Sequence, residues 1–283
     1  MSGSVPPLDP GPTPGRSRIG WWWLLVALLA VGLVTALVAQ PWAPVETEPS
    51  VTPTVTSPTP ESSSAPSSAS PSVTVPGADA VFDATTAPAL FVTTDDLVAE
   101  IPAADPEVQL QIPSGQLSWG LPLGSTIEPP ECLVAATVVA VPPPWYDTLL
   151  WGNDALSFQQ EVVLLADPAA AREAFRALVT TVDACPEYSQ VNPDIDGATW
   201  TAEPAIEGQG VFPSIVQEVT HSAEGSDVPG YRGHLLVGNT IVTWTAEALT
   251  TGDRDAALAT LGDPADLSAM VQERAQEAVR ALG

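Results

Sequence analysis

Residues 158–185 of the chain read FQQEVVLLADPAAAREAFRALVTTVDAC. The run from Phe158 to Leu165 is short and apolar, which is typical of a buried strand. Asp167-Pro168 then marks a helix start, because aspartate is a favoured N-cap and proline is tolerated in the first helical turn. From Ala169 to Cys185 apolar residues recur every three or four positions, so we predict an amphipathic helix that buries one stripe. The stripe consists of Ala171, Phe175, Leu178, Val182 and Cys185.

A second segment, HLLVGNTIVTWT at residues 234–245, predicts a β-hairpin that turns at Gly238-Asn239. Residues 215–220 read IVQEVT, and we predict a further strand there. Because predicted helices lie between the strands and the one tight connection joins neighbouring strands, we expect an α+β fold. This fold is an antiparallel sheet with flanking helices in one domain, residues 79–283.

Two more helix starts flank these strands. Thr94-Asp95-Asp96 resembles an N-cap and an acidic first turn, and it would open a short helix that ends before Pro102. Asp263-Pro264 repeats the device that precedes residue 169, and a final amphipathic helix follows it. One face of this helix carries Leu267, Val271, Ala278 and Leu282.

The 283-residue chain is strongly acidic. It holds 34 Asp and Glu against 8 basic residues, all of them arginine, for a formal net charge of −26. Nucleic-acid binding needs a clustered positive surface, so this charge argues against a nucleic-acid partner. Residues 79–283 alone carry 30 acidic residues and 6 arginines, a net charge of −24, which we attribute mainly to solubility.

The N-terminal part differs in composition from the rest. Residues 19–39 contain no charge, and 21 residues suffice for a helix across the hydrocarbon core, so we predict a transmembrane helix at 19–40. Arg16 and Arg18 precede it, so the positive-inside rule places residues 1–18, a disordered tail, in the cytoplasm and the C-terminal domain outside the cell membrane. The alternative is a cleaved signal peptide with Val34-Thr35-Ala36 as its cleavage site.

Residues 41–78 contain nine prolines and fifteen serines and threonines. Such a composition cannot bury enough apolar surface to offset chain entropy, and proline favours extended backbone. We predict a disordered stalk between the membrane and the domain.

The two cysteines, Cys132 and Cys185, both follow the predicted span and would therefore lie in an oxidising compartment. We expect them to form a structural disulfide, which the chain-entropy model values at about 4 kcal/mol. A redox-active thiol has no support, because the sequence has no C-x-x-C motif.

Catalytic signatures are scarce, and we expect no enzymatic activity and no cofactor. The chain has two histidines, no lysine, no G-x-S-x-G and no H-E-x-x-H. We expect His234, on a hairpin strand, to be a partly buried, hydrogen-bonded imidazole. A glycosidase that uses two carboxylates needs neither histidine nor lysine, so it stays open as an alternative.

Two further groups are candidate binding residues. Trp145, Tyr146 and Trp151 follow three prolines and could line an apolar ligand cleft, or they could cap the edge of the core. Asn192, Asp194, Asp196 and Glu203 have the spacing of a calcium loop. Pro193 and Pro204 disfavour the helices of such a loop, so we favour a turn at 193–197 that leads into a strand at 198–202.

The order of these features resembles the PknH-like extracellular sensor domain, which occurs on actinobacterial Ser/Thr kinases and on standalone anchored proteins. The resemblance rests on the single span, the stalk, the Pro-Pro-Glu-Cys132 segment, residues 159–185 and Gly238-Asn239-Thr240-Ile241-Val242. It implies an antiparallel sheet with flanking helices, a cleft as ligand site and no catalysis. Family members often have a second disulfide, with a cysteine shortly before the hairpin, where this chain has Tyr231-Arg232-Gly233.

We therefore expect an extracytoplasmic ligand-binding or sensor-type domain, anchored by a single-pass helix. Its expected partners are membrane lipid, an extracytoplasmic ligand such as a cell-envelope component, and a separate membrane signalling protein. The alternative function is that of a structural or carrier protein of the cell envelope that binds lipid or wall polymer.

Overall fold

A computed structural model describes residues 76–105, 107–193, 195–250 and 252–283. The predicted tail and span, and the predicted stalk up to residue 75, lie outside these residues. Within the described ranges no helix combines the length and the apolar character needed to cross a membrane.

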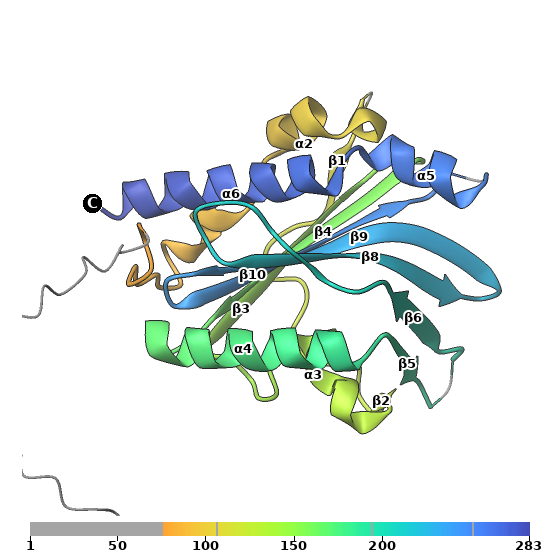
Figure 1. Ribbon diagram of the computed structural model, residues 1–283, viewed down its shortest axis with the longest axis horizontal. Helices are drawn as coiled ribbons and strands as arrows, with labels where there is room; N and C mark the ends of the chain where they lie inside the picture. Colours follow the sequence, from red (N-terminus) through yellow and green to blue (C-terminus); the bar gives the residue numbers. More distant parts are fainter. Residues whose placement is uncertain (1–75, 106, 194, 251) are drawn as a thin grey trace, which may run out of the picture. The chain divides into compact units, whose positions relative to one another are not determined.

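The domain is built on one ten-stranded sheet in the order β1-β3-β4-β10-β9-β8-β6-β5-β2, with β7 paired to β8 (Figure 1). The strands are β1 (Gln109–Ile112), β2 (Thr126–Glu128), β3 (Trp145–Gly152), β4 (Leu156–Leu164), β5 (Glu187–Val191), β6 (Ala198–Ala202), β7 (Ile206–Glu207), β8 (Ser214–Ala223), β9 (Ser226–Val237) and β10 (Thr240–Ala248). Each pairing in this order is antiparallel. The expected α+β class with an antiparallel sheet is confirmed.

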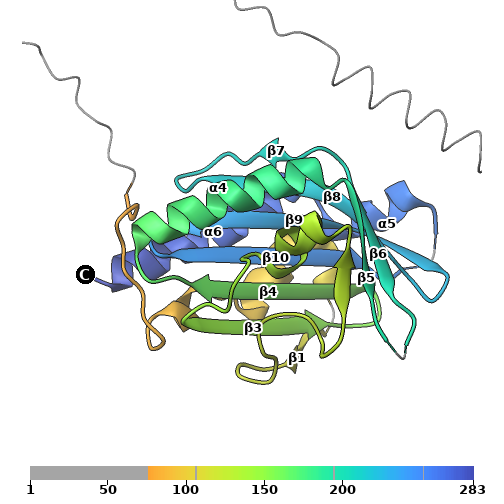
Figure 2. The same ribbon diagram turned by 90° about the horizontal axis from the view of Figure 1, so that it is seen from below.

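Helices cover both faces of the sheet. They are η1 (Ala87–Leu90), α2 (Thr94–Glu100), η2 (Pro102–Ala104), η3 (Pro130–Cys132), α3 (Leu133–Thr137), α4 (Pro168–Ala184), α5 (Arg254–Leu261) and α6 (Pro264–Ala281). The helices α2, α5 and α6 lie on one face, and α3 and α4 lie on the other (Figures 1 and 2). Each face therefore has its own hydrophobic core, with Trp244 and Leu267 in the first and Val163 and Leu178 in the second.

The two predicted segments form the elements that their patterns indicated. Asp167 caps α4 by accepting a hydrogen bond from the backbone of Ala170 at 2.8 Å, and all five residues of the predicted stripe are buried. The hairpin joins β9 to β10 across Gly238, whose φ of +55° lies in the left-handed region that favours glycine.

Two details at helix ends differ from the sequence predictions. The N-cap of α2 is Thr93 rather than Thr94, because Thr93 and Asp96 form a reciprocal capping box. Leu282 does not join the buried face of the last helix. It follows the end of α6 and is 37% exposed, since the sheet no longer faces it there.

Candidate functional site

The sheet face under α3 and α4 changes from apolar to polar along its strands. In β4 this face carries Val163 and then Glu161, and in β10 it carries Ile241 and then Thr243, since side chains alternate along a strand. The same change occurs in β9 between Leu236 and His234. The apolar part of the face packs against α4 and is buried. The polar part lies farther along the same strands.

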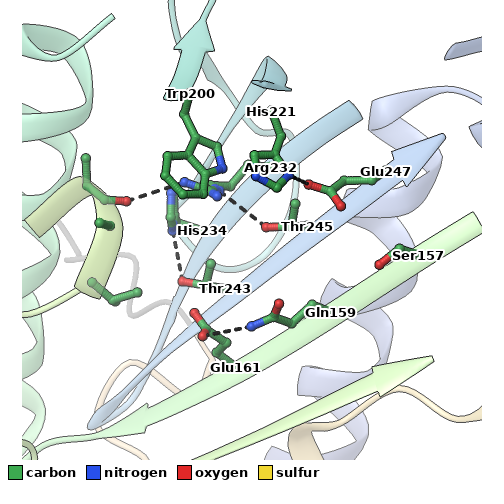
Figure 3. Close-up of a pocket in the computed structure, with 13 residues that line it drawn as sticks. Ser157, Gln159, Glu161, Trp200, His221, Arg232, His234, Thr243, Thr245 and Glu247 are labelled. Carbon is green, nitrogen blue, oxygen red and sulfur yellow. Dashed lines mark hydrogen bonds and ion pairs between the residues drawn. The ribbon is translucent and has the colours of Figure 1, made fainter. Parts of the chain in front are cut away.

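The polar part of this face forms the floor of a cleft of about 250 Å³, and α3 forms one wall. The cleft is smaller than the usual site of a drug-sized ligand, so it suits a small molecule. The floor residues come from β4, β10, β9, β8 and β6, and Figure 3 shows how they lie. They are Ser157, Gln159 and Glu161 of β4, Thr243, Thr245 and Glu247 of β10, Arg232 and His234 of β9, His221 of β8 and Trp200 of β6, with Ala135, Ala136 and Val138 in the wall.

Arg232 is a half-buried cation at the centre of the floor. Its Nε donates to Thr245 Oγ1 at 3.2 Å, and its Nη1 donates to Tyr188 Oη at 2.6 Å and to the carbonyl oxygen of Ala135 at 3.5 Å. These partners are all neutral oxygens. The contact with Ala135 also ties the floor of the cleft to its α3 wall.

His234 lies beside Arg232 on the same face of β9 (Figure 3). Its Nδ1 shares a hydrogen bond of 2.9 Å with Thr243 Oγ1, as a buried histidine on a hairpin strand should. The other ring nitrogen, Nε2, is buried and has no partner among the described residues. Burial, together with the positive charge of Arg232, lowers the pKa of His234 to about 3, so the ring is neutral at ordinary pH.

Two carboxylates in the cleft are already engaged. Glu161 Oε1 accepts from Tyr146 Oη at 2.7 Å and from Gln159 Nε2 at 3.0 Å. Burial raises the pKa of Glu161 above the ordinary value, although these donors and Arg232 oppose the shift. Glu247 lies 3.2 Å from His221 Nδ1, and both side chains are about a quarter exposed or less.

Three rings form a ladder at the side of the cleft. The Trp200 indole stacks on Tyr188 at a centroid distance of 5.4 Å and on His221 at 4.8 Å, with interplanar angles of 16° and 2°. These residues are direct cross-strand neighbours on β5, β6 and β8. Because both faces of Trp200 are covered, a ligand in the cleft would meet the edge of the indole.

A disulfide between Cys132 and Cys185 holds the α3 wall, with 5.7 Å between the two Cα atoms. It joins the end of η3 to the residue that follows α4, which confirms the expected pairing. Val138, which ends α3 and lines the cleft, has a φ of +67°. Such a conformation is strained for a β-branched residue, and strain of this kind is frequent at binding sites.

The predicted aromatic group is not gathered in one place. Trp151 is 3% exposed and packs in the core under α6 with Phe158, and Trp145 packs against that same core. Tyr146 points to the opposite face, where it contacts Glu161. None of the three lines the cleft, and a role for them in ligand binding stays a prediction.

Asn192 and Asp196 of the predicted calcium loop precede β6, the strand predicted at residues 198–202, and Glu203 directly follows its end. Asn192 uses its amide locally. Its Oδ1 accepts from Ser125 at 2.6 Å and from Gln190 at 2.8 Å, and its Nδ2 donates to the carbonyl oxygen of Asp196 at 3.2 Å. Asp194 lies outside the described residues, so calcium binding stays a prediction.

The floor residues on β4 and β10 were not predicted from the sequence. A signal was present, because Ser157-x-Gln159-x-Glu161 and Thr243-x-Thr245-x-Glu247 are polar residues with the period of a strand, directly beside apolar residues of the same face. What the pattern cannot supply is the register that places β4, β10 and β9 side by side.

No family model matches the sequence, and no curated protein matches it. A search of solved structures finds the extracellular domain of PknH from Mycobacterium tuberculosis, which is 14% identical with a TM-score of 0.49; the match covers 70% of this chain and 98% of that one. It also finds an uncharacterised protein of Mycobacterium smegmatis, a Rv0999 ortholog, which is 16% identical with a TM-score of 0.34; the match covers 66% of this chain and 94% of that one.

Proposed function

We propose that the chain is a membrane-anchored, extracytoplasmic binding protein of the sensor type, and that the cleft over β4, β10, β9 and β8 is its ligand site. The observation that carries the proposal is the polar floor of this cleft, where the Arg232 guanidinium contacts only neutral oxygens and His234 Nε2 has no partner among the described residues. Buried polar atoms are normally paired, and a ligand would give His234 Nε2 a partner and bring a negative charge to Arg232.

Binding rather than catalysis is favoured by the way the histidines are paired. His234 contacts the hydroxyl of Thr243, but no carboxylate bonds to its other nitrogen. His221 contacts the carboxylate of Glu247, but no hydroxyl or thiol bond to it is present among the described residues. Acyl transfer needs a nucleophile, a histidine and a carboxylate in series. The described residues do not form such a series in the cleft.

The extracytoplasmic location is supported by the disulfide, because structural disulfides persist in oxidising compartments. The anchor is supported by the uncharged run at residues 19–39. A signal would pass to a separate membrane protein. A carrier of envelope lipid or wall polymer is the alternative function.

The test is a binding screen on the full chain, purified with detergent, against soluble wall-glycan and wall-peptide fragments with a thermal-shift readout. Ala136→Trp fills the cleft from its α3 wall, and Ala177→Trp places the same ring on the exposed side of α4 as a control. We expect at least one fragment to stabilise the unchanged chain and Ala177→Trp but not Ala136→Trp. If a fragment stabilises all three proteins equally, its binding site is not this cleft. Turnover of a glycan during the screen would indicate an enzyme instead of a binding protein.

A further inference from the structure

Arg232 differs from the other arginines of the domain. Arg172, Arg254 and Arg274 each lie within 4.0 Å of a carboxylate, and Arg176 and Arg280 are exposed. Arg232 is half-buried and has no carboxylate at that distance among the described residues. A guanidinium removed from water binds most strongly to an anion that it can contact with two N–H groups.

His234 supplies a second donor at the same place. Thr243 has a hydroxyl proton that it can donate to His234 Nδ1, and in this tautomer the unpartnered Nε2 carries the proton of the neutral ring. Arg232 and His234 are two residues apart on one strand and therefore point to the same side of the sheet. An anion with two oxygens can accept from both.

The surrounding charges limit the anion to one negative charge. Glu161 and Glu247 line the same cleft, and residues 79–283 carry a net charge of −24. Glu161 and Glu247 repel any anion in this partly desolvated site, and the repulsion is twice as large for a doubly charged phosphate as for a carboxylate, so the single charge of Arg232 favours the carboxylate. The remaining floor offers hydroxyl and amide groups from Ser157, Gln159 and Thr245, which suit a polar ligand body.

We propose that the cleft binds a small polar ligand through one carboxylate group, whose oxygens accept hydrogen bonds from Arg232 and His234. This inference rests on the proposed function and names the ligand class for the same site. Carboxylates of peptide ends and of acidic sugars share this chemistry, and a probe of each kind separates the two sources.

The experiment uses the full chain in detergent with its two histidines isotope-labelled, so that ring resonances report on the cleft. The probes are N-acetylalanine and glucuronic acid, their neutral primary amides, N-acetylglucosamine and glycerol phosphate. We expect at least one acid to shift the His234 resonances and to bind at least about tenfold more tightly than its amide. Arg232→Gln should abolish this preference, and the matched surface variant Arg172→Gln should keep it.

The second variant is Glu247→Gln, for which we expect tighter acid binding, because it removes a negative charge from the cleft. Misfolding would weaken binding, so it cannot produce this result. An acid that binds no better than its amide, a preference that survives Arg232→Gln, or tighter binding of glycerol phosphate overturns the carboxylate inference. If amides or N-acetylglucosamine shift the resonances and acids do not, the ligand class is wrong and the site stands. If no probe shifts them in the millimolar range, both proposals fail.

Discussion

Gln160 is a polar residue in the middle of β4 whose side chain is fully buried. Its Oε1 accepts from the backbone of Val92 at 2.8 Å, and its Nε2 donates to the carbonyl oxygen of Leu90 at 3.0 Å. Asn239 binds both backbone groups of Phe82 in the same way, and Gln272 binds those of Phe212. Each amide thus satisfies a buried loop segment that has no strand partner of its own.

Replacement of Gln160 by leucine should therefore lower the free energy of unfolding by about 2–4 kcal/mol, because two buried backbone groups lose their partners. Urea denaturation of the full chain measures the loss. The control is Gln116→Leu, since Gln116 is exposed and has no side-chain hydrogen bond among the described residues, and it should change the stability by less than about 0.5 kcal/mol. Equal effects of the two substitutions would show that the amide bonds of Gln160 contribute nothing.

The buried ring of His234 predicts a pH dependence of stability. Its folded-state pKa is about 3, and the ordinary value is 6.5, so between these values the unfolded chain binds a proton that the folded chain does not. Stability must then fall as pH decreases below about 6.5, by up to about 1.4 kcal/mol per pH unit. The raised pKa of Glu161 acts with the opposite sign above the ordinary glutamate value.

The measurement is the difference in unfolding free energy between the unchanged chain and His234→Gln at several pH values from about 7 to about 5, in which the contribution of Glu161 largely cancels. We expect the unchanged chain to lose stability relative to the variant as the pH falls. A difference that is constant with pH would mean that the imidazole titrates normally and is open to water.

Single residues were predictable where a local rule fixed them. Asp167 caps a helix and Gly238 turns a hairpin because capping and turn geometry depend on neighbours in the sequence. Gln160 and Arg232 were not, since their partners are 68 and 44 residues away in the chain. Tyr146 was also not predictable as a partner of Glu161. Its strand was not predicted, and the contact follows from the pairing of β3 with β4.

At the scale of elements, the short helix α3 depends on the disulfide. It has five residues, too few to be stable alone, and Cys132 directly precedes it. The bond to Cys185 fixes it against α4, and Ala135 and Val138 of this region then form the wall of the cleft.

Removal of the disulfide by the double substitution Cys132→Ala and Cys185→Ala should cost about 4 kcal/mol of unfolding free energy. Reductant should lower the stability of the unchanged chain by a similar amount and leave the double variant unaffected. Urea denaturation with and without reductant measures both effects, and mass spectrometry after alkylation counts the thiols. Two free thiols in unreduced native protein would contradict the bond.

The disulfide should also affect ligand binding in the cleft. When α3 is released, the carbonyl oxygen of Ala135 no longer accepts from Arg232. We expect ligands of the cleft to bind more weakly to the double variant even at a temperature where it remains folded, as a binding titration below its unfolding transition would detect. Unchanged affinity would mean that α3 is held by its apolar contacts alone.

Elements with a strong local period, such as α4, α6 and the β9–β10 hairpin, were predictable. The edge strands β1, β2 and β7 have two to four residues and were not, because so short a run carries no measurable period. The sheet order was also out of reach. It places β4 beside β10 rather than next to β5, and it is set by burial of the two cores rather than by any turn.

At the scale of the whole molecule, composition and function are linked by charge. An acidic domain with no lysine keeps one half-buried arginine in its cleft, where its hydrogen-bond partners among the described residues are neutral and the nearest charges are those of Glu161 and Glu247. Removing such a charge from water is unfavourable, so favourable interactions must offset the desolvation. Binding of an anionic group in the cleft would offset part of this cost.

The location of the domain is the last prediction. Because the uncharged run at 19–39 follows Arg16 and Arg18, the C-terminal domain should lie outside the cell and the N-terminus inside. An epitope after Gly283 should be removed by protease added to intact cells, and an epitope before residue 1 should be protected until the membrane is opened. The full chain should sediment with membranes, and a variant without residues 19–40, directed outward by an unrelated cleaved signal, should be soluble. A mature N-terminus near residue 37 would instead indicate signal cleavage, and a protected C-terminal epitope would place Cys132 and Cys185 in a reducing compartment, where their bond would not persist.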